Sequence, residues 1–290
     1  MKYFYYPGCS LEGSAMEYDR ATRAVLTALG AELMEVKDWT CCGASAAEPI
    51  NYLLSMVLPA RNLALARQMD GDADFVIPCS ACYLNLRKVD DHVQRDDGLA
   101  DRINRILGEE GLNYRPGLKA RHLLDVLAND IGAQGLRGKV SKPLGGLRIA
   151  PYYGCQALRP YGSYDDPEQP RSMEPLLRAL GAEVFPWSMG AKCCAAGLMT
   201  TKKKVGLKAV VDLLTAAQGA DAIVTVCPMC QMNLDSFQKQ ASQRRGEVLS
   251  ISVLYLPQLM GLAMGLSSDA VGLGQNMVVS DAFRVKVGQS

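Results

Sequence analysis

The chain has 290 residues, of which 49% are hydrophobic and 21% are charged, a balance that is ordinary for a globular protein. This balance excludes a disordered or collagen-like chain. The net charge is +1, so the composition predicts no basic surface for nucleic acid and no electrostatic attraction to an anionic membrane.

The first half of the chain alternates strand and helix patterns. In chain order, the sequence predicts a strand at residues 2–6, a helix at 14–29, a strand at 31–36, a helix at about 49–69 and a strand at 74–77. No signal-peptide pattern precedes the first predicted strand. We therefore expect a cytoplasmic protein.

The second half repeats this order. We expect a strand at 148–152, a helix at 172–180, a strand at 182–186, a helix near 198–218, a strand at 222–226 and a helix that begins at Pro228. Between the halves, residues 132–146 are rich in glycine and lysine, which is typical of a linker. The sequence thus predicts two modules, residues 1–145 and residues 146–290.

The longest apolar stretch, residues 253–266, has about 14 residues and contains Pro257. A helix needs about 20 apolar residues to cross a bilayer, so the sequence predicts no membrane span. The stretch is interpreted either as a buried core segment or as a surface that docks a partner.

Alternation of strands and helices predicts an α/β fold with mostly parallel sheets and right-handed crossovers. Each module is expected to be Rossmann-like, and the two in tandem are expected to be pseudo-symmetric. The carboxyl ends of parallel strands meet at one edge, where such sheets place their ligands. We therefore expect any cofactor sites at these strand ends.

The ten cysteines fall into two copies of one pattern, which is a lone cysteine, then an adjacent pair, then a Cys-x-x-Cys motif. The first set comprises Cys9, Cys41, Cys42, Cys79 and Cys82. The second set comprises Cys155, Cys193, Cys194, Cys227 and Cys230. Because no cysteine lies outside these two sets, we expect two metal sites with five candidate ligands each.

Iron–sulfur clusters, zinc and disulfides are the candidate chemistries. Adjacent cysteines rarely meet the geometry of an unstrained disulfide, and disulfides are rare in the cytoplasm. A structural zinc ion takes four cysteines, typically from two separated pairs, whereas each set here has five thiols and one Cys-x-x-Cys. A cluster of several irons can use five thiolates, which favours iron and sulfur and keeps zinc as the alternative.

The first set, in the order Cys-x31-Cys-Cys-x36-Cys-x2-Cys with Gly43 completing Cys-Cys-Gly, resembles the cysteine-rich CCG domain. Two such domains make up the B subunit of heterodisulfide reductase and its homologues, and the resemblance covers nearly the whole chain. It implies that each set of five cysteines holds one non-cubane [4Fe-4S] cluster. The clusters are then the catalytic groups, and no side-chain acid or base is assigned.

The resemblance implies the catalytic iron–sulfur component of a heterodisulfide-reductase-like complex, which reduces or forms a disulfide or a related sulfur bond. Such a component works with a ferredoxin-like C subunit and a flavoprotein A subunit on a small or carrier-bound sulfur substrate. The chain has no Gly-x-Gly-x-x-Gly motif for a flavin or nicotinamide, and no ferredoxin-type cysteine run. Electrons must therefore pass to or from a partner, and their direction stays open.

Two other functions stay open. The same domain occurs in electron-transfer subunits of hydroxyacid or quinone-linked oxidoreductases, which have no substrate of their own. A zinc-stabilised scaffold protein is the other alternative. Gln156 stands where methanogen-type subunits have a histidine, so the resemblance favours a homologue that acts on another sulfur compound.

The second set departs from the family pattern, because Ala195 replaces the glycine after its cysteine pair. If that glycine has a positive φ, we expect Ala195 to follow a different backbone path. Tyr6 and Tyr153 adjoin the lone cysteines, and they are interpreted as core aromatics or as shields of a cluster.

Four further features outside the cysteine motifs have ordinary interpretations. His92 and His122 lie in helical sequence and are interpreted as surface or capping residues. The three lysines at 202–204 are interpreted as a solvated helix face, with attraction of an anionic substrate or an acidic partner as the alternative. Arg159 is interpreted as a structural ion-pair partner or as a contact to a cluster or a carboxylate.

Overall fold

The computed structural model describes residues 1–44, 46–69 and 71–288. Its strands are β1 (Lys2–Tyr5), β2 (Glu32–Glu35), β3 (Asp74–Ile77), β4 (Ala120–His122), β5 (Arg148–Tyr152), β6 (Glu183–Val184), β7 (Ala222–Thr225) and β8 (Ser252–Tyr255). They form two four-stranded sheets, in the orders β2-β1-β3-β4 and β6-β5-β7-β8. Every pairing is parallel. The predicted α/β fold with two similar parallel-sheet modules is therefore confirmed.

Short and medium helices connect the strands. The α-helices of the first half are α1 (Cys9–Glu12), α2 (Met16–Ala28), α3 (Ala47–Ile50), α4 (Tyr52–Arg67), α5 (Ser80–Val93), α6 (Leu99–Leu107), α7 (Leu123–Asp125) and α8 (Gly132–Arg137). Those of the second half are α9 (Met173–Ala179), α10 (Lys203–Ala216), α11 (Pro228–Ser236), α12 (Gln238–Arg245), α13 (Leu256–Ala263) and α14 (Asp281–Lys286). Single turns of 3-10 helix lie at Gly108–Glu110, Ala196–Leu198 and Leu273–Gln275, and a π-helical turn spans Val126–Ile131.

The inner strands are mostly apolar because helices cover both faces of a parallel sheet. Phe75, Val76 and Ile77 of β3 are fully buried, as are Ile223 and Val224 of β7. Strands of this kind carry a strong sequence signal. The predicted strands at 74–77 and 148–152 accordingly match β3 and β5 residue for residue.

Two predicted helices are interrupted. The helix predicted at 49–69 is broken at Asn51, whose side chain accepts a hydrogen bond from Leu54 N at 3.0 Å and so caps α4. The helix predicted near 198–218 begins only at Lys203, after a separate turn at Ala196–Leu198. Strands β4 and β8 were not predicted at all, so each predicted sheet lacked one edge strand.

The apolar stretch at 253–266 is not a free docking surface, so that alternative is wrong. It contains most of β8 and all of α13, and every residue of α13 is buried. The linker predicted at 132–146 is also wrong in its first part, because these residues form α8, where Leu136 is fully buried. No helix among the described residues is long and apolar enough to cross a membrane.

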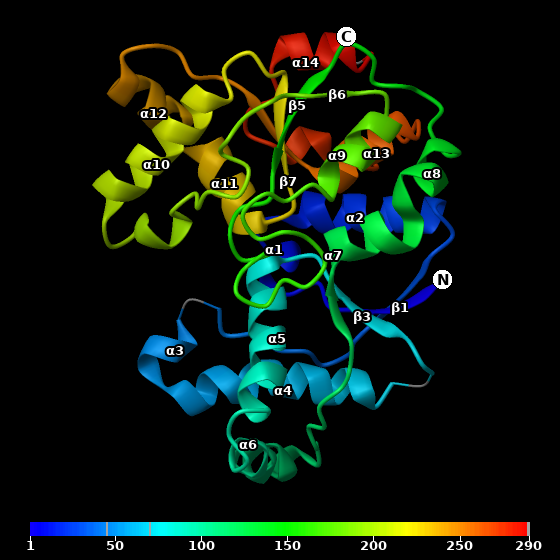
Figure 1. The fold of residues 1–290 in the computed structure, drawn as a ribbon, viewed down its shortest axis with the longest axis vertical. Helices are drawn as coiled ribbons and strands as arrows, with labels where there is room; N and C mark the ends of the chain where they lie inside the picture. The colour runs from blue at the N-terminus through cyan, green and yellow to red at the C-terminus, as the bar shows by residue number, and fades with distance from the viewer. Residues whose placement is uncertain (45, 70, 289–290) are drawn as a thin grey trace.

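The two modules pack closely against each other. In Figure 1 helices α3 to α6 of the first module lie in the lower half of the view and helices α9 to α14 of the second in the upper half, with α2 between them. Helix α2 packs against α13, and α8 packs against α9, so each contact joins one helix from each half. A single cluster of buried apolar residues runs through both halves, which fixes the two sheets relative to each other.

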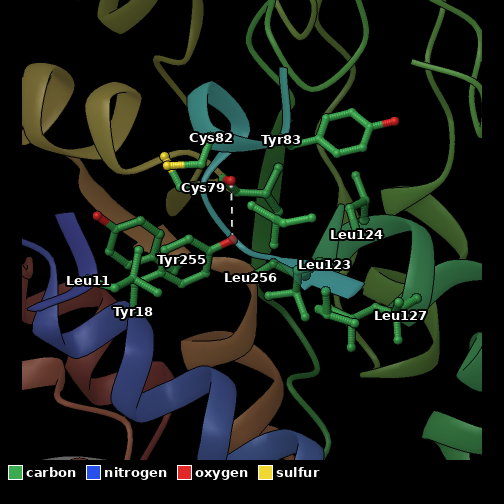
Figure 2. Close-up of a cluster of buried hydrophobic side chains, with 14 of the residues drawn as sticks. Leu11, Tyr18, Cys79, Cys82, Tyr83, Leu123, Leu124, Leu127, Tyr255 and Leu256 are labelled. Carbon is green, nitrogen blue, oxygen red and sulfur yellow. Dashed lines mark hydrogen bonds between the residues drawn. The ribbon is translucent and has the colours of Figure 1, made fainter. Parts of the chain in front are cut away.

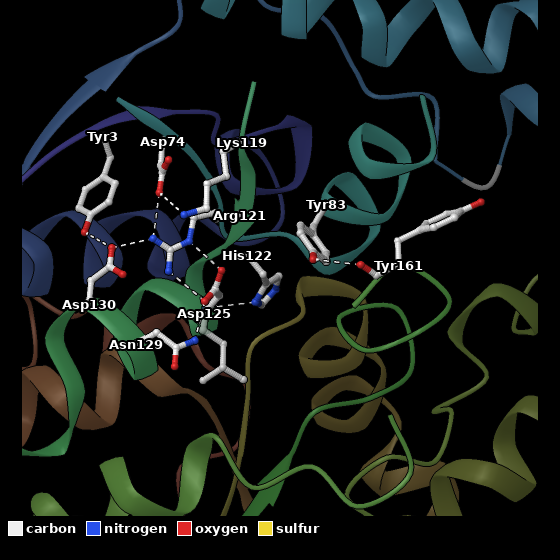
Figure 3. A network of polar contacts seen from close by, with 11 residues as sticks. Tyr3, Asp74, Tyr83, Lys119, Arg121, His122, Asp125, Asn129, Asp130 and Tyr161 are labelled. Atoms are coloured by element: carbon white, nitrogen blue, oxygen red, sulfur yellow. Dashed lines mark hydrogen bonds and ion pairs between the residues drawn. The ribbon is translucent and has the colours of Figure 1, made fainter. Parts of the chain in front are cut away.

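The buried guanidinium of Arg121 links several elements near the β4 edge of the first sheet (Figure 3). Arg121 of β4 donates to Asp125 at 2.7 Å, to Asp130 at 2.7 Å and to Asp74 at 3.0 Å. Tyr3 of β1 also donates to Asp130, at 2.7 Å. Because Arg121 is surrounded by carboxylates on several elements, it links β1, β3, β4 and the helical turn that follows.

Candidate metal centre

The cysteines lie where the strands end, as the sequence predicted for cofactor sites. In the first module, Cys9 begins α1 after β1, and Cys79 occupies the N-cap position of α5 after β3. Between them in sequence, the pair Cys41 and Cys42 lies in the loop that follows β2. Cys227 repeats the arrangement in the second module, where it occupies the N-cap position of α11 after β7. The carboxyl ends of neighbouring parallel strands meet at one edge, which gathers each set in one place.

Each set divides into an inner group and an outer group. The inner thiols are 1–4% exposed, namely Cys42, Cys79, Cys82, Cys194, Cys227 and Cys230. The outer thiols are Cys9 and Cys41 in the first set, which are exposed, and Cys155 and Cys193 in the second, which are half-buried and exposed. Each site therefore has a buried floor of three thiols and an open side with two.

The sulfur atoms stand in close pairs. In the first set, the Sγ atoms of Cys42 and Cys82 are 3.2 Å apart, and those of Cys9 and Cys41 are 3.8 Å apart. In the second set, Cys194 and Cys230 are separated by 3.4 Å. Within the described ranges, no three or more His, Cys, Asp or Glu side chains are arranged to hold a single metal ion. The thiols of each set thus gather at the sheet edge as close pairs, and not as a group of three around a single ion.

A cavity of about 320 Å³ lies at the second set. All five thiols of that set line it, together with Ser80, Gln156, Leu198 and Met229. The volume is in the range of ligand and cofactor sites, about 300–1,000 Å³. Soft thiolate ligands suit iron–sulfur clusters and zinc, and no carboxylate or imidazole lines the space. The donor set and the cavity therefore fit a multi-atom thiolate-bound group.

One outer thiol of each set ionises easily, whereas the pKa values of Cys9 and Cys155 are raised, by burial and by the hydrogen bond with Cys193 respectively. The hydrogen bond with Cys42 lowers the pKa of Cys41 to about 5. The hydrogen bond with Cys155 lowers the pKa of Cys193 to about 6, and the Ala195 N–H, 3.3 Å from the sulfur, acts in the same direction. Because the thiolate is the metal-binding form of cysteine, each site presents a ready anionic ligand on its open side at neutral pH.

Two glycines that are part of the repeated sequence pattern, but had no predicted role, have a steric function. Gly8 and Gly154 precede the lone cysteines and have φ values of +73° and +70°. A Cβ atom at Gly8 would lie 3.0 Å from Cys82 Sγ, and one at Gly154 would lie 3.1 Å from Cys230 Sγ. The backbone here passes directly against the last thiol of each set. The signal in the sequence was the Gly-Cys pair at the first position of both copies.

Ala195 does not follow a different path, so that expectation is wrong. Its backbone is left-handed, with φ of 57° and ψ of 28°. Gly43, its counterpart in the first module, also has a positive φ, of 75°. The chain therefore keeps the same turn after the cysteine pair in both modules, and the second module holds an alanine in a conformation that favours glycine.

Two asparagines hold the cysteine pairs, and their repetition in the sequence carried no predicted role. Asn85 of α5 donates to the carbonyl oxygen of Cys42 at 2.9 Å. Asn233 of α11 donates to the carbonyl oxygen of Cys194 at 2.8 Å. Both lie three residues after the last cysteine of their set. Each helix that carries the Cys-x-x-Cys motif thus also fixes the adjacent-cysteine loop.

A tyrosine at or directly after the end of the first strand of each module also holds this loop. Tyr6 donates to the carbonyl of Thr40 at 2.7 Å, and Tyr152 donates to the carbonyl of Lys192 at 2.7 Å. Each acceptor directly precedes the adjacent cysteine pair. The counterpart of Tyr6 is therefore Tyr152, and Tyr153 instead bonds Glu174. Both residues that the sequence singled out, Tyr6 and Tyr153, are buried core aromatics.

Both histidines make hydrogen bonds to groups outside the two cysteine sets. His122 is not helical but ends β4, where its Nδ1 accepts from Leu124 N at 3.1 Å and caps α7. Burial lowers the pKa of His122 to about 4, so the imidazole is neutral. His92, on α5, lies 2.8 Å from Tyr52 Oη and 3.2 Å from Tyr161 Oη. The capping interpretation is confirmed for His122, and His92 joins the two modules.

The basic residues near the second set have ordinary surroundings. Arg159 pairs with Glu168 at 2.6 Å and donates to the carbonyl of Ala191 at 2.6 Å, which confirms its structural interpretation. The lysines at 202–204 are exposed at the start of α10. This exposure is compatible with a solvated face, and attraction of an anionic substrate or an acidic partner stays the alternative.

Comparison with known proteins gives two domain matches in this chain. The family described as CCG, cysteine-rich domain, matches residues 3–87 and again residues 149–235. The chain is 34% identical to the 8-methylmenaquinol:fumarate reductase membrane anchor subunit of Wolinella succinogenes, over 96% of this chain and 97% of that protein. It is 29% identical to a protein of Archaeoglobus profundus that is named as similar to the heterodisulfide reductase B subunit, over 93% of each chain.

A third relative is the B subunit of the ferredoxin/F(420)H(2)-dependent CoB-CoM heterodisulfide reductase of Methanosarcina acetivorans, with 27% identity over 97% of this chain and 95% of that protein. Among solved structures, a hypothetical protein from Helicobacter pylori has the same fold, with a TM-score of 0.79 at 14% identity. The likeness covers 97% of this chain and 52% of that one, so this chain spans about half its length.

Proposed function

This chain belongs to the cysteine-rich CCG domain family, with the domain present twice, and we propose that it is the catalytic iron–sulfur subunit of a heterodisulfide-reductase-like complex. In this role it reduces or forms a disulfide or a related sulfur bond. The relatives named for the heterodisulfide reductase B subunit, at 27–29% identity over most of the chain, support this assignment.

The observation that carries the proposal is the pairing of two equivalent five-thiol sets across the module interface. Ser80, which follows Cys79 of the first set, lines the cavity of the second set. Tyr18 contacts the backbone directly before Cys79 and directly before Cys227. A disulfide has two equivalent sulfurs, and two neighbouring sites with an open side each are suited to address both.

All ten cysteines are the proposed ligands of two non-cubane [4Fe-4S] clusters, five for each cluster. Such clusters supply one-electron redox chemistry and irons that bind sulfur. The protein contributes the remaining functions. The inner thiols and the asparagine and tyrosine contacts fix the ligand loops, and the open side with its outer thiols admits the sulfur compound. Residues 1–145 and 146–290 remain the proposed modules, because each range holds one sheet and one set.

The proposed complex contains a ferredoxin-like C subunit and a flavoprotein A subunit, which exchange electrons with this chain in the cytoplasm. The names of the relatives as B subunits support the presence of partner subunits. The substrate is a small or carrier-bound sulfur compound. Leu198 and Met229 give the rim of the second cavity an apolar character, and Gln156 adds a neutral hydrogen-bonding group.

Metal analysis of anaerobically purified protein tests the proposal. We expect about eight irons and eight sulfides per chain, as two four-iron clusters require, with no stoichiometric zinc. Cys42→Ala and Cys194→Ala should each remove about half of the iron, and each variant is the control for the other. Zinc in place of iron would indicate the scaffold alternative.

Catalysis is tested on the same preparation. Electron paramagnetic resonance of the oxidised protein should change when a thiol is added, and reduced protein should cleave a model disulfide such as hydroxyethyl disulfide. Neither the thiol-dependent change in the spectrum nor the cleavage of the disulfide should survive Cys42→Ala or Cys194→Ala, because both sites are needed. Intact clusters that respond to neither thiol nor disulfide would contradict a catalytic role.

One observation favours a second candidate, an electron-transfer subunit of a quinone-linked oxidoreductase. The relative from Wolinella succinogenes, at 34% identity, is named as the membrane anchor of an 8-methylmenaquinol:fumarate reductase. An electron-transfer subunit would bind iron but would be indifferent to thiols and disulfides. The resonance experiment therefore separates the two candidates.

A further inference from the structure

One buried hydroxyl lies between the two cysteine sets. Tyr18 of α2 is fully buried, and its phenol oxygen lies 3.0 Å from the carbonyl oxygen of Pro78 and 3.2 Å from that of Val226. These carbonyls belong to the peptide bonds that lead into Cys79 and Cys227. A phenol has one proton to donate, so the two carbonyls share a single donor.

A second donor reaches only the second of these carbonyls. Ser80 Oγ lies 3.1 Å from the carbonyl oxygen of Val226 and 3.1 Å from His122 Nε2. His122 Nδ1 accepts from Leu124 N, so the neutral ring carries its proton on Nε2 and donates it to Ser80. The serine hydroxyl is thereby left to donate to Val226. The chain of donors runs from the first module into the cysteine turn of the second.

The side chains that donate these hydrogen bonds are closely packed and buried. Tyr18 is stacked on Tyr255 with ring centroids 4.1 Å apart and an interplanar angle of 2°. Figure 2 shows the two rings side by side, next to Cys79 and Cys82. Ser80 and His122 are 1% and 0% exposed. Water cannot replace a lost hydrogen bond at this depth without a rearrangement of the packing.

From this geometry we propose that Tyr18 and Ser80 are positioning residues that tune the two cluster sites, with Tyr18 acting on both and Ser80 on the second alone. The inference rests on the proposed function, because it assumes that clusters occupy both cysteine sets. It adds a physical link between the sites that the ten ligands do not provide.

The sign of the effect follows from the direction of the dipoles. Each hydroxyl places a positive hydrogen beside the peptide that precedes a ligand cysteine. Hydrogen bonds around a cluster favour its more negative, reduced state and so raise its reduction potential. Removing the Tyr18 hydroxyl should lower the potentials of both clusters. Removing the Ser80 hydroxyl should lower only the potential of the cluster held by Cys227.

The test is a redox titration of anaerobically purified full-length protein, followed by electron paramagnetic resonance, for the wild type, Tyr18→Phe and Ser80→Ala. Tyr83→Phe is the matched control, because Tyr83 is a buried tyrosine whose hydroxyl donates across the same interface, to the carbonyl of Tyr161 at 3.4 Å. Cys194→Ala assigns the signals, since it should remove the second cluster.

We expect lower potentials for both signals in Tyr18→Phe, for one signal in Ser80→Ala and for neither in Tyr83→Phe, with equal iron in all three variants. Intact clusters with unmoved potentials in Tyr18→Phe and Ser80→Ala would overturn the inference and leave the proposed function standing. Equal shifts in Tyr83→Phe would also overturn it, because they would indicate a general loosening of the interface. A protein without iron would overturn the proposed function and this inference together.

Discussion

Gly8 offers a sharp test of how the backbone shapes the first site. Its φ of 73° and ψ of 164° lie in a region that only glycine occupies readily. An alanine here meets two costs. The backbone strain is about 1–3 kcal/mol, and the new Cβ lies 3.0 Å from Cys82 Sγ, closer than ordinary van der Waals contact. Because Cys82 is a proposed ligand, relief of that contact must displace it.

Gly30 provides the matched control in the same module. It also has a positive φ, of 81°, but a Cβ atom there would meet nothing within 4 Å. Gly30→Ala should therefore cost about 1–2 kcal/mol of left-handed strain and no more. Gly8→Ala should cost at least as much stability and should in addition lose about half of the bound iron.

Denaturant unfolding at neutral pH gives the free energies, and iron analysis of the same anaerobic samples gives the site occupancy. Iron near the wild-type value in Gly8→Ala would refute the reasoning, because it would show that the Cys82 position tolerates the added carbon. Iron loss in Gly30→Ala would refute it equally, since backbone strain alone would then empty the site.

Three further outcomes are expected. Ala195→Gly should stabilise the protein by roughly 0.5–1 kcal/mol in denaturant unfolding, because it removes left-handed strain at a cost in chain entropy; destabilisation would show that the methyl group packs usefully. Asn233→Ala should cost about 1–3 kcal/mol and loosen the second cluster only, since the carbonyl of Cys194 loses its donor; unchanged unfolding and iron would contradict the clamp. Burial raises the pKa of Asp125, but hydrogen bonds from Arg121 outweigh burial and hold that pKa below its ordinary value. The ionised Asp125 therefore stabilises the fold above about pH 4, and this contribution is lost as the pH falls through the lowered pKa. Asp125→Asn should flatten that acid loss in unfolding measured from pH 6 to pH 3, and an unchanged slope would contradict it.

Much of the candidate site was predictable because its signals are local. The two cysteine sets, the Gly-Cys pairs at Gly8 and Gly154, and the repeated asparagines are all patterns along the chain. Strands buried on both faces are apolar runs, which is why β3 and β5 were predicted with their correct bounds. A duplicated sequence also predicts duplicated structure, and the two sheets have equivalent strand orders.

Other features required long-range contacts. The strand β4 has three residues and pairs with β3 from more than forty residues away, so no local pattern marks it. His122 is fully buried because of that pairing, although its own sequence looked helical. The left-handed turn of Ala195 is likewise imposed by its surroundings, because an alanine on its own prefers other conformations.

The sequence by itself therefore determined the class of fold and the two cysteine sets that we propose as ligands, since apolar periodicity and cysteine spacing are written in residue type and position. Only the tertiary structure decided how the two sites meet. Tyr18 is an ordinary apolar-face residue of α2 in the sequence, and it becomes the donor shared by Pro78 and Val226 only because the packing of α2 against α13 carries it to the interface. That packing joins residues more than two hundred positions apart in the chain, and no local signal encodes it.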